Sequence, residues 1–115
     1  HLLARFFLGE SDRRDGIPLS EAIVQHARAS GLAGATVLRG VEGFGAHSRI
    51  HRSSILRLSE DLPIVVELVD EREKIEQFLT ELEPWIGGGM VTVEPVEVVL
   101  YRPPPTGPEP TRDPR

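Results

Sequence analysis

The sequence predicts an α+β domain whose elements follow in the order strand, helix, strand, strand, helix, strand. Three observations support this order. Short apolar runs end at glycine or proline, two longer segments repeat apolar residues at every third or fourth position, and each of those segments follows a strand-like run.

The first half of the chain supplies a strand, a helix and a second strand. Leu2–Leu8 is rich in Phe and Leu, as strands are, and Pro18 suits the first turn of a helix that runs to about Ser30. Gly31 is a natural stop for that helix, because glycine readily takes the left-handed conformation that often ends helices. Ala33–Val41 is predicted as the next strand.

The second half begins with a predicted strand over Leu62–Val69, which is nearly continuous in apolar residues. Asp70 and Glu73 then form a D-x-x-E arrangement in which Asp70 is expected to cap a second helix. The predicted buried stripe of that helix consists of Ile75, Phe78, Leu79 and Leu82. Pro84 should end or kink it, because proline lacks the N–H donor that the helix needs.

The last predicted strand is Met90–Tyr101, reached through a tight turn at Gly87–Gly89. Its inward-facing residues change phase at Pro95, which predicts a β-bulge there. With right-handed crossovers, the whole order gives a ferredoxin-like βαββαβ domain, a four-stranded antiparallel sheet with two helices on one face.

Composition divides the chain into a domain over residues 1–101 and a tail over residues 102–115. The tail is rich in proline and has no large apolar residue, so we expect it to be disordered; a Pro-rich docking motif is the alternative. The net charge of −5 argues against nucleic acid as a partner. No cysteine is present, no apolar run is as long as a membrane span, and Leu2–Leu8 lacks the flanks of a signal peptide, so a cytoplasmic location is expected.

The sheet face away from the helices is predicted to carry apolar residues. We expect Leu3, Arg5, Phe7, Val37, Arg39, Val65, Glu67, Glu97, Val99 and Tyr101 on that face. Such a surface favours a homo-oligomer in which the charges pair across a symmetric interface. The alternative is a monomer whose Arg-rich loop or tail covers the sheet.

The segment from Arg39 to Arg52 concentrates glycine, arginine and histidine. Backbone amides near Gly43 and Gly45 are able to form an anion-binding nest, and the guanidinium groups of three arginines suit phosphate or carboxylate. The candidate ligand-binding residues are Arg39, Gly43, Phe44, Gly45, His47, Arg49, His51 and Arg52, with Gly87, Gly88 and Gly89 as a second backbone surface. A flexible loop with solvated charges, and a plain turn at the three glycines, are the structural alternatives.

Two other kinds of chemistry are weighed for the same segment. His47 and His51 are four residues apart and would bind a metal if they shared a helical face, but they lie in a predicted loop without a third ligand in register. A small hydrolase would use His47 with Glu10 or Asp12, yet the sequence offers no nucleophile and base at a diagnostic spacing. We therefore predict neither a catalytic nor a metal site. His26 is interpreted as a histidine at the edge of the core.

The stretch from Leu32 to His51, with Gly-Phe-Gly-Ala-His-Ser at its centre, resembles the PII-like family known as domain of unknown function 190. Gly9-Glu-Ser-Asp, Pro18-Leu-Ser-Glu-Ala-Ile and Leu58-Ser-Glu-Asp-Leu-Pro extend the resemblance over nearly all of residues 2–101. More distantly, the chain is similar to the PII nitrogen-signalling proteins. That resemblance implies a trimer that binds adenine nucleotides between subunits and uses a mobile loop to contact membrane transporters or enzymes.

By resemblance, Gly43–Gly45 match the base of the mobile loop, residues 46–57 its body, and Gly87–Gly89 the loop on the phosphate side. The chain departs from the PII pattern at three places. PII proteins carry a glutamine shortly after Gly-Phe-Gly that helps hold a metal, and His47 is near that position here. The loop on the phosphate side has no basic residue, and only Arg102 represents the basic residues of the last strand. We therefore expect a non-catalytic sensor that binds a small anionic ligand, with a nucleotide as the candidate, and that regulates a membrane transporter or channel.

Overall fold

The structure is a computed structural model that describes residues 1–44, 51–52 and 61–103. Its main elements are β1 (Leu2–Gly9), α1 (Leu19–Ala29), β4 (Thr36–Arg39), β7 (Pro63–Asp70), α2 (Arg72–Leu82), the 3₁₀ turn η2 (Glu83–Trp85) and β8 (Met90–Pro95). Four further short strands form two small hairpins, β2 (Arg13–Arg14) with β3 (Ile17–Pro18), and β5 (Glu42–Gly43) with β6 (His51–Arg52).

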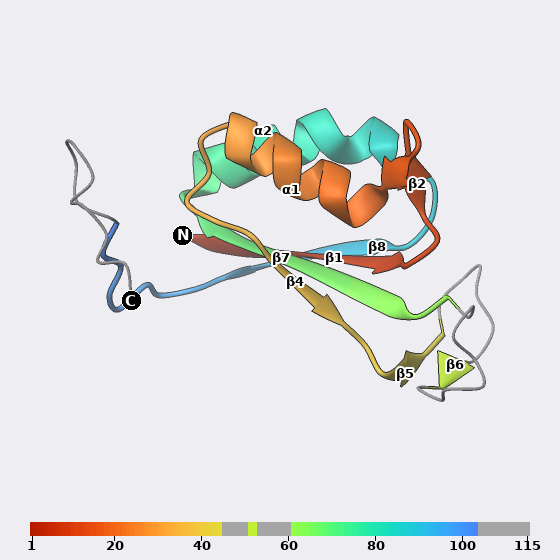
Figure 1. The fold of residues 1–115 in the computed structure, drawn as a ribbon. Coiled ribbons are helices and arrows are strands. Elements are labelled where there is room, and N and C mark those ends of the chain that lie inside the picture. The colour runs from red at the N-terminus through yellow and green to blue at the C-terminus, as the bar shows by residue number, and fades with distance from the viewer. Residues whose placement is uncertain (45–50, 53–60, 104–115) are drawn as a thin grey trace, which may run out of the picture.

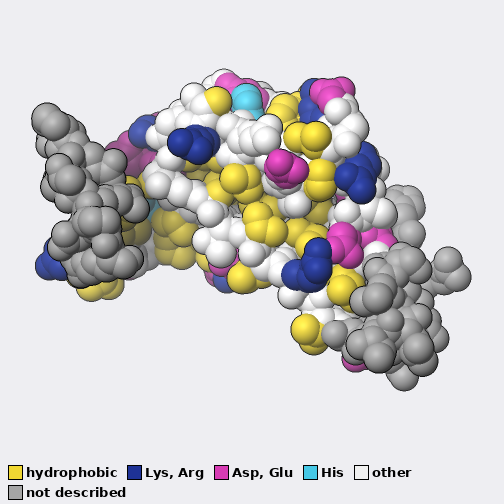
Figure 2. Space-filling model, in the orientation of Figure 1, with side chains coloured by type: hydrophobic (Ala, Val, Ile, Leu, Met, Phe, Trp, Pro, Cys, Tyr) yellow, Lys and Arg dark blue, Asp and Glu magenta, His cyan; other side chains and the backbone are white. Residues whose placement is uncertain are grey.

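The four main strands form one sheet in the order β4-β7-β1-β8, and all neighbours are antiparallel. Both helices cover the same face of this sheet, and within the described residues no helix lies on the opposite face (Figure 1). The predicted α+β, ferredoxin-like arrangement is therefore confirmed. Figure 2 shows hydrophobic side chains on the outside as well, gathered over the region between α1 and the edge strand β4.

The core lies between the helices and the sheet because alternate residues of the two central strands point to the helices. In β1 these are Leu2, Ala4, Phe6 and Leu8, all buried, and their half-buried neighbours face the other way. The ring of Phe6 meets that of Phe78 edge to face, with 6.3 Å between centroids. Three of the four predicted stripe residues of α2 are buried, and Leu79 is partly buried against the core.

The ends of the helices follow the predicted signals except at Asp70. Gly31 has a φ of +78° directly after the end of α1, and α2 gives way to a 3₁₀ turn at Pro84, as expected. The prediction that Asp70 caps α2 is wrong, because Glu71 is the residue before the helix. Asp70 is instead buried at the end of β7, where its carboxylate accepts hydrogen bonds from the backbone N–H of Ala33 and of Glu71.

The strand β4 is shorter than predicted, and its faces are reversed. Val37 pairs with Val66 and therefore lies on the helix side, whereas Leu38 pairs with Val65 and lies on the open face. Val37 and Arg39 were predicted for the open face. Both alternating sets of this strand contain apolar residues, so periodicity alone does not determine which set faces the helices.

The last strand also ends early. The structure ends β8 at Pro95, so the prediction of one strand over Met90–Tyr101 with a bulge is wrong. Proline cannot donate to the ladder, and the backbone continues with one hydrogen bond from Val96 N to His1 O (3.1 Å). We name residues 96–101 the C-terminal arm; it passes beyond the end of the sheet near the N-terminus (Figure 1). The arm exposes four consecutive hydrophobic side chains, Val98, Val99, Leu100 and Tyr101.

Candidate functional site

A cleft of about 810 Å³ lies at the end of the sheet where β1 finishes and β7 begins. Six parts of the chain line it: the end of β1, the segment Ser11–Arg13 that follows it, Leu19 at the start of α1, Gly43 and Phe44, the segment Asp61–Ile64 at the start of β7, and the stretch from Trp85 to Met90. The lining combines apolar side chains with glycine backbone and a small polar group of Ser11, Asp12, Arg13 and Asp61. Such a mixture is typical of small-molecule sites, which enclose roughly 300–1,000 Å³.

The turn after β1 is fixed by two carboxylates. Asp12 Oδ2 accepts a hydrogen bond from Gly9 N (2.9 Å), and Asp61 Oδ1 accepts one from Ser11 N (2.6 Å). A Cβ on Gly9 would lie 2.5 Å from Asp61 Oδ2, so glycine is required for this close approach. Asp61 thereby ties the end of segment 42–61 to the turn at the cleft.

The other end of that segment is held by Pro63. Gly40 N donates to Pro63 O (2.7 Å), and a Cβ on Gly40 would lie 2.6 Å from Pro63 Cγ. Gly43 packs against the same ring, and its pairing with His51 joins β5 to β6. These contacts place Gly43 and the exposed ring of Phe44 at the rim of the cleft.

The three glycines Gly87–Gly89 form the opposite side of the cleft. They follow η2, which ends at Trp85, and they lead into β8. Gly89 has a φ of +105°, a conformation that favours glycine, and it passes close to the backbone of Phe7. The cleft therefore offers backbone from two glycine-containing segments that are more than 40 residues apart.

Five of the predicted site residues line the cleft, and the other six either do not line it or lie outside the described residues. Gly43, Phe44, Gly87, Gly88 and Gly89 all line the cleft. Arg39, at the end of β4, is not among the lining residues and forms an ion pair with Glu10. His51 and Arg52 form β6, and Gly45, His47 and Arg49 lie outside the described residues.

Sequence reasoning missed several lining residues, chiefly Arg13, Asp61 and Trp85. None of the three is among the candidate ligand-binding residues that the sequence indicated. One signal for Arg13 was available: Asp15-Gly16 is a typical hairpin turn, and it orders the loop in which Arg13 lies.

His26 lies between the two helices and does not line the cleft, although its ring centroid is 5.2 Å from that of Trp85, which does. It is half-buried and stacks on Phe78 with 5.4 Å between ring centroids, which confirms it as a histidine at the edge of the core. Its Nε2 lies 2.7 Å from Glu81 Oε1. Hydrogen bonds from Gln77 and from His26 hold the pKa of Glu81 below its ordinary value.

The described part of the chain has neither a membrane-spanning helix nor a cluster of metal ligands. None of its helices is long and apolar enough to cross a membrane. No group of three or more His, Asp or Glu side chains is arranged there to hold a metal ion, but His47 is outside that part of the chain.

The sequence is similar to a family of proteins without an assigned activity. The model of the family described as "DUF190: Uncharacterized ACR" matches residues 1–98. A "UPF0166 protein" of Aquifex aeolicus is 38% identical over 97 residues, which cover 84% of this chain and 91% of that protein. Another, from Methanocaldococcus jannaschii, is 32% identical over 80 residues, covering 70% of this chain and 73% of that protein.

Solved structures of PII-like proteins share the fold. CPII of Thiomonas intermedia, in a structure with ADP, AMP and bicarbonate, has a TM-score of 0.60 at 17% identity, with 81% of this chain and 82% of that chain covered. A PII-like protein of Thermus thermophilus has a TM-score of 0.53 at 19% identity, with 81% of each chain covered. At these identities the comparison shows the fold alone.

Proposed function

We propose that this chain, which belongs to the DUF190 family, is a non-catalytic sensor that binds a small anionic ligand, with an adenine nucleotide as the candidate. The observation that carries the proposal is the cleft, because it brings Gly43–Phe44 and Gly87–Gly89 to the two sides of one space. Backbone amides of glycine segments can approach phosphate closely. The apolar lining, which includes Phe44 and Trp85, suits a flat base.

The likeness to CPII supports the choice of ligand. CPII has the same fold and was solved with ADP, AMP and bicarbonate, although its sequence is distant. The residues that line the cleft of this chain also favour a binding role over a catalytic one. Among the described lining residues there is no histidine, and Ser11, the only hydroxyl nucleophile there, has no paired base.

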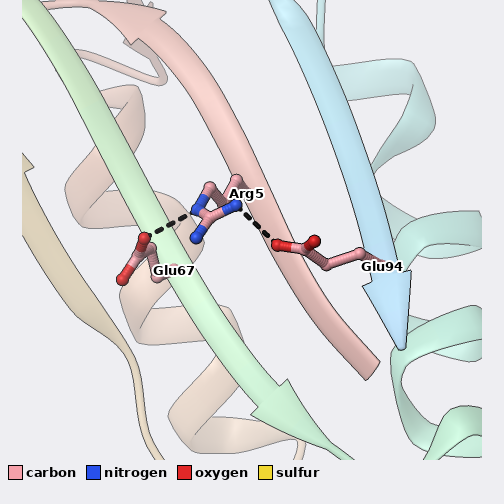
Figure 3. Close-up of polar contacts among 3 residues, drawn as sticks. All are labelled: Arg5, Glu67 and Glu94. Atoms are coloured by element: carbon pink, nitrogen blue, oxygen red, sulfur yellow. Dashed lines mark hydrogen bonds and ion pairs between the residues drawn. The ribbon is translucent and has the colours of Figure 1, made fainter. Parts of the chain in front are cut away.

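A homo-oligomer, specifically a trimer, is part of the proposal. The open sheet face contains Leu3, Phe7, Leu38, Val65 and Met90, none of which is fully buried in the single subunit. Arg5 lies in the middle of this face, where its Nε is 2.8 Å from Glu67 Oε2 and its Nη1 is 2.8 Å from Glu94 Oε1 (Figure 3). Both partners of the guanidinium therefore belong to its own subunit. The same hydrogen bonds hold the pKa of Arg5 above its ordinary value, which keeps the guanidinium charged and paired.

The apolar residues that surround this cluster make the face suited to burial against a second copy. The C-terminal arm adds a second apolar surface, since Val99 is 87% exposed in the single subunit. Clefts between subunits would then enlarge the site around Gly87–Gly89.

Segment 42–57 is the proposed contact with the regulated protein, a membrane transporter or channel. Its first residues line the cleft, so a bound ligand would contact the base of the segment directly. We propose that this takes place in the cytoplasm, where free adenine nucleotides are available.

Isothermal titration calorimetry of the full chain with ADP, AMP, ATP and bicarbonate tests the proposal. We expect heat and a rise in the unfolding temperature with at least one adenine nucleotide, because a ligand that binds only the folded state stabilises it. A chain that gives neither heat nor a thermal shift with any of the four compounds would contradict the proposed ligand class. Metal analysis before and after His47→Ala and His51→Ala tests the metal alternative.

A further inference from the structure

The short hairpin between β1 and α1 holds a cationic side chain at the cleft. Its strands β2 and β3 pair Arg14 with Ile17, which leaves Asp15-Gly16 as a two-residue turn. Both turn residues have positive φ, 52° and 85°, as a type I′ turn requires. A two-residue turn of this type fixes the register of the strands, so Arg13 and Arg14 have defined positions.

The hairpin is attached to the segment that presents the three glycines. The guanidinium carbon of Arg14 lies 4.0 Å from the centroid of the Trp85 ring, a cation–π contact. Leu19 N donates to Asp12 O (2.8 Å), which joins the hairpin to the start of α1. Arg13 lines the cleft, as Trp85 does, whereas Arg14 is not among the lining residues.

Arg13 is the only Lys or Arg among the described residues that line the cleft. The two acids beside it, Asp12 and Asp61, already accept hydrogen bonds from backbone amides. Within the described part of the chain, Arg5, Arg39 and Arg72 each form an ion pair with a glutamate, and Arg13 forms none. The side chain of Arg13 is exposed, so an anion that enters the cleft from solvent can reach its guanidinium.

We infer that Arg13 is a specificity-determining residue that binds the phosphate of the ligand in the cleft that the backbone of Gly87–Gly89 also lines. The inference rests on the proposed function and deepens it. A loop of three glycines brings amides but no charge, and the arginine from the hairpin supplies the charge from another part of the fold. A guanidinium can donate two parallel hydrogen bonds to a phosphate. Arg13 would therefore select phosphorylated ligands both by its charge and by the geometry of these hydrogen bonds.

ADP titrations of the full chain, followed by calorimetry at several salt concentrations, test this role. Arg13→Gln should weaken ADP binding by about tenfold or more, because a charge-assisted hydrogen bond is lost. Affinity of the variant should also depend less steeply on salt than that of the wild type, since one cation–phosphate attraction is missing. Arg13→Lys should retain part of the affinity, because it keeps the charge without the fork.

The matched control is Arg28→Gln, which removes the same charge from the exposed end of α1, outside the cleft. It should bind ADP as the wild type does, and both glutamine variants should unfold at the wild-type temperature without ligand. If Arg13→Gln binds ADP as tightly as Arg28→Gln, or loses affinity with an unchanged salt dependence, the role of Arg13 is wrong. A wild-type chain that binds no ADP would instead contradict the ligand of the proposed function.

Discussion

A Cβ atom on Gly89 would lie 2.4 Å from the carbonyl oxygen of Phe7. This close approach connects the glycine segment of the cleft to β1, one of the two central strands, which supplies four of the seven buried hydrophobic residues of the sheet. The φ of +105° at Gly89 adds a second constraint, because side chains strain that backbone conformation.

Gly89→Ala is therefore expected to destabilise the fold by more than about 1 kcal/mol, through strain and through the contact with Phe7. Urea unfolding followed by circular dichroism measures the change. Gly87→Ala is the matched control, since nothing lies within 4 Å of a Cβ there. Equal unfolding midpoints for the two variants would contradict this account of the glycine segment.

Val99→Glu is expected to weaken the oligomer. The side chain is 87% exposed in the single subunit, so the substitution should leave the subunit fold intact. A carboxylate buried between subunits without a partner is costly, and we expect the dissociation constant of the assembly to rise at least about tenfold.

Sedimentation velocity over a range of concentrations measures this effect. Ala29→Glu adds the same charge at the exposed end of α1 and should leave the assembly mass unchanged. A wild-type chain that sediments as a single subunit at all concentrations would refute the oligomer, and an unchanged assembly for Val99→Glu would exclude the C-terminal arm from the interface.

Glu81→Gln is expected to change how the stability of the fold depends on pH in the acid range. The pKa of Glu81 is lowered by hydrogen bonds from Gln77 and then His26, so its charged form is favoured in the folded state. A depressed folded-state pKa gives a contribution to stability that is present above the unfolded value of 4.5 and disappears as the pH falls through the folded value.

The unfolding temperatures of wild type and Glu81→Gln should thus differ most above pH 4.5 and converge at lower pH. Differential scanning calorimetry in steps from neutral to acid pH gives the comparison. Glu76→Gln serves as control, because its carboxylate has only a long contact of 3.7 Å to Arg72 on the helix surface. A constant difference at every pH would show that Glu81 contributes through packing rather than charge.

Removing residues 103–115 is expected to leave the stability of the domain unchanged to within about 0.5 kcal/mol. The proposed tail lacks large apolar residues, and the family model ends at residue 98. Thermal unfolding of the shortened chain beside the full chain tests this boundary. A large loss of stability would place part of the tail within the folded domain.

Local patterns were enough to predict most of the elements. The apolar stripe of α2, the alternation along β1 and the stop signals at Gly31 and Pro84 each act within a few residues, and the structure follows them. Errors appeared where a local pattern allowed two answers. The alternation of β4 is apolar on both sides, and Pro95 was compatible with either a bulge or the end of a strand.

The candidate site shows the same division. Glycine-rich segments at 43–44 and 87–89 are visible in the sequence, but their meeting at one cleft depends on the antiparallel packing of β1 against both β7 and β8. The sequence equally does not reveal that Arg39 pairs with Glu10 while Arg13 lines the cleft. Residue types and short-range periodicity determined the secondary-structure elements and the chemical groups available. Only the tertiary structure decided which of these groups meet, because strand register and long-range contacts bring together residues that are distant along the chain.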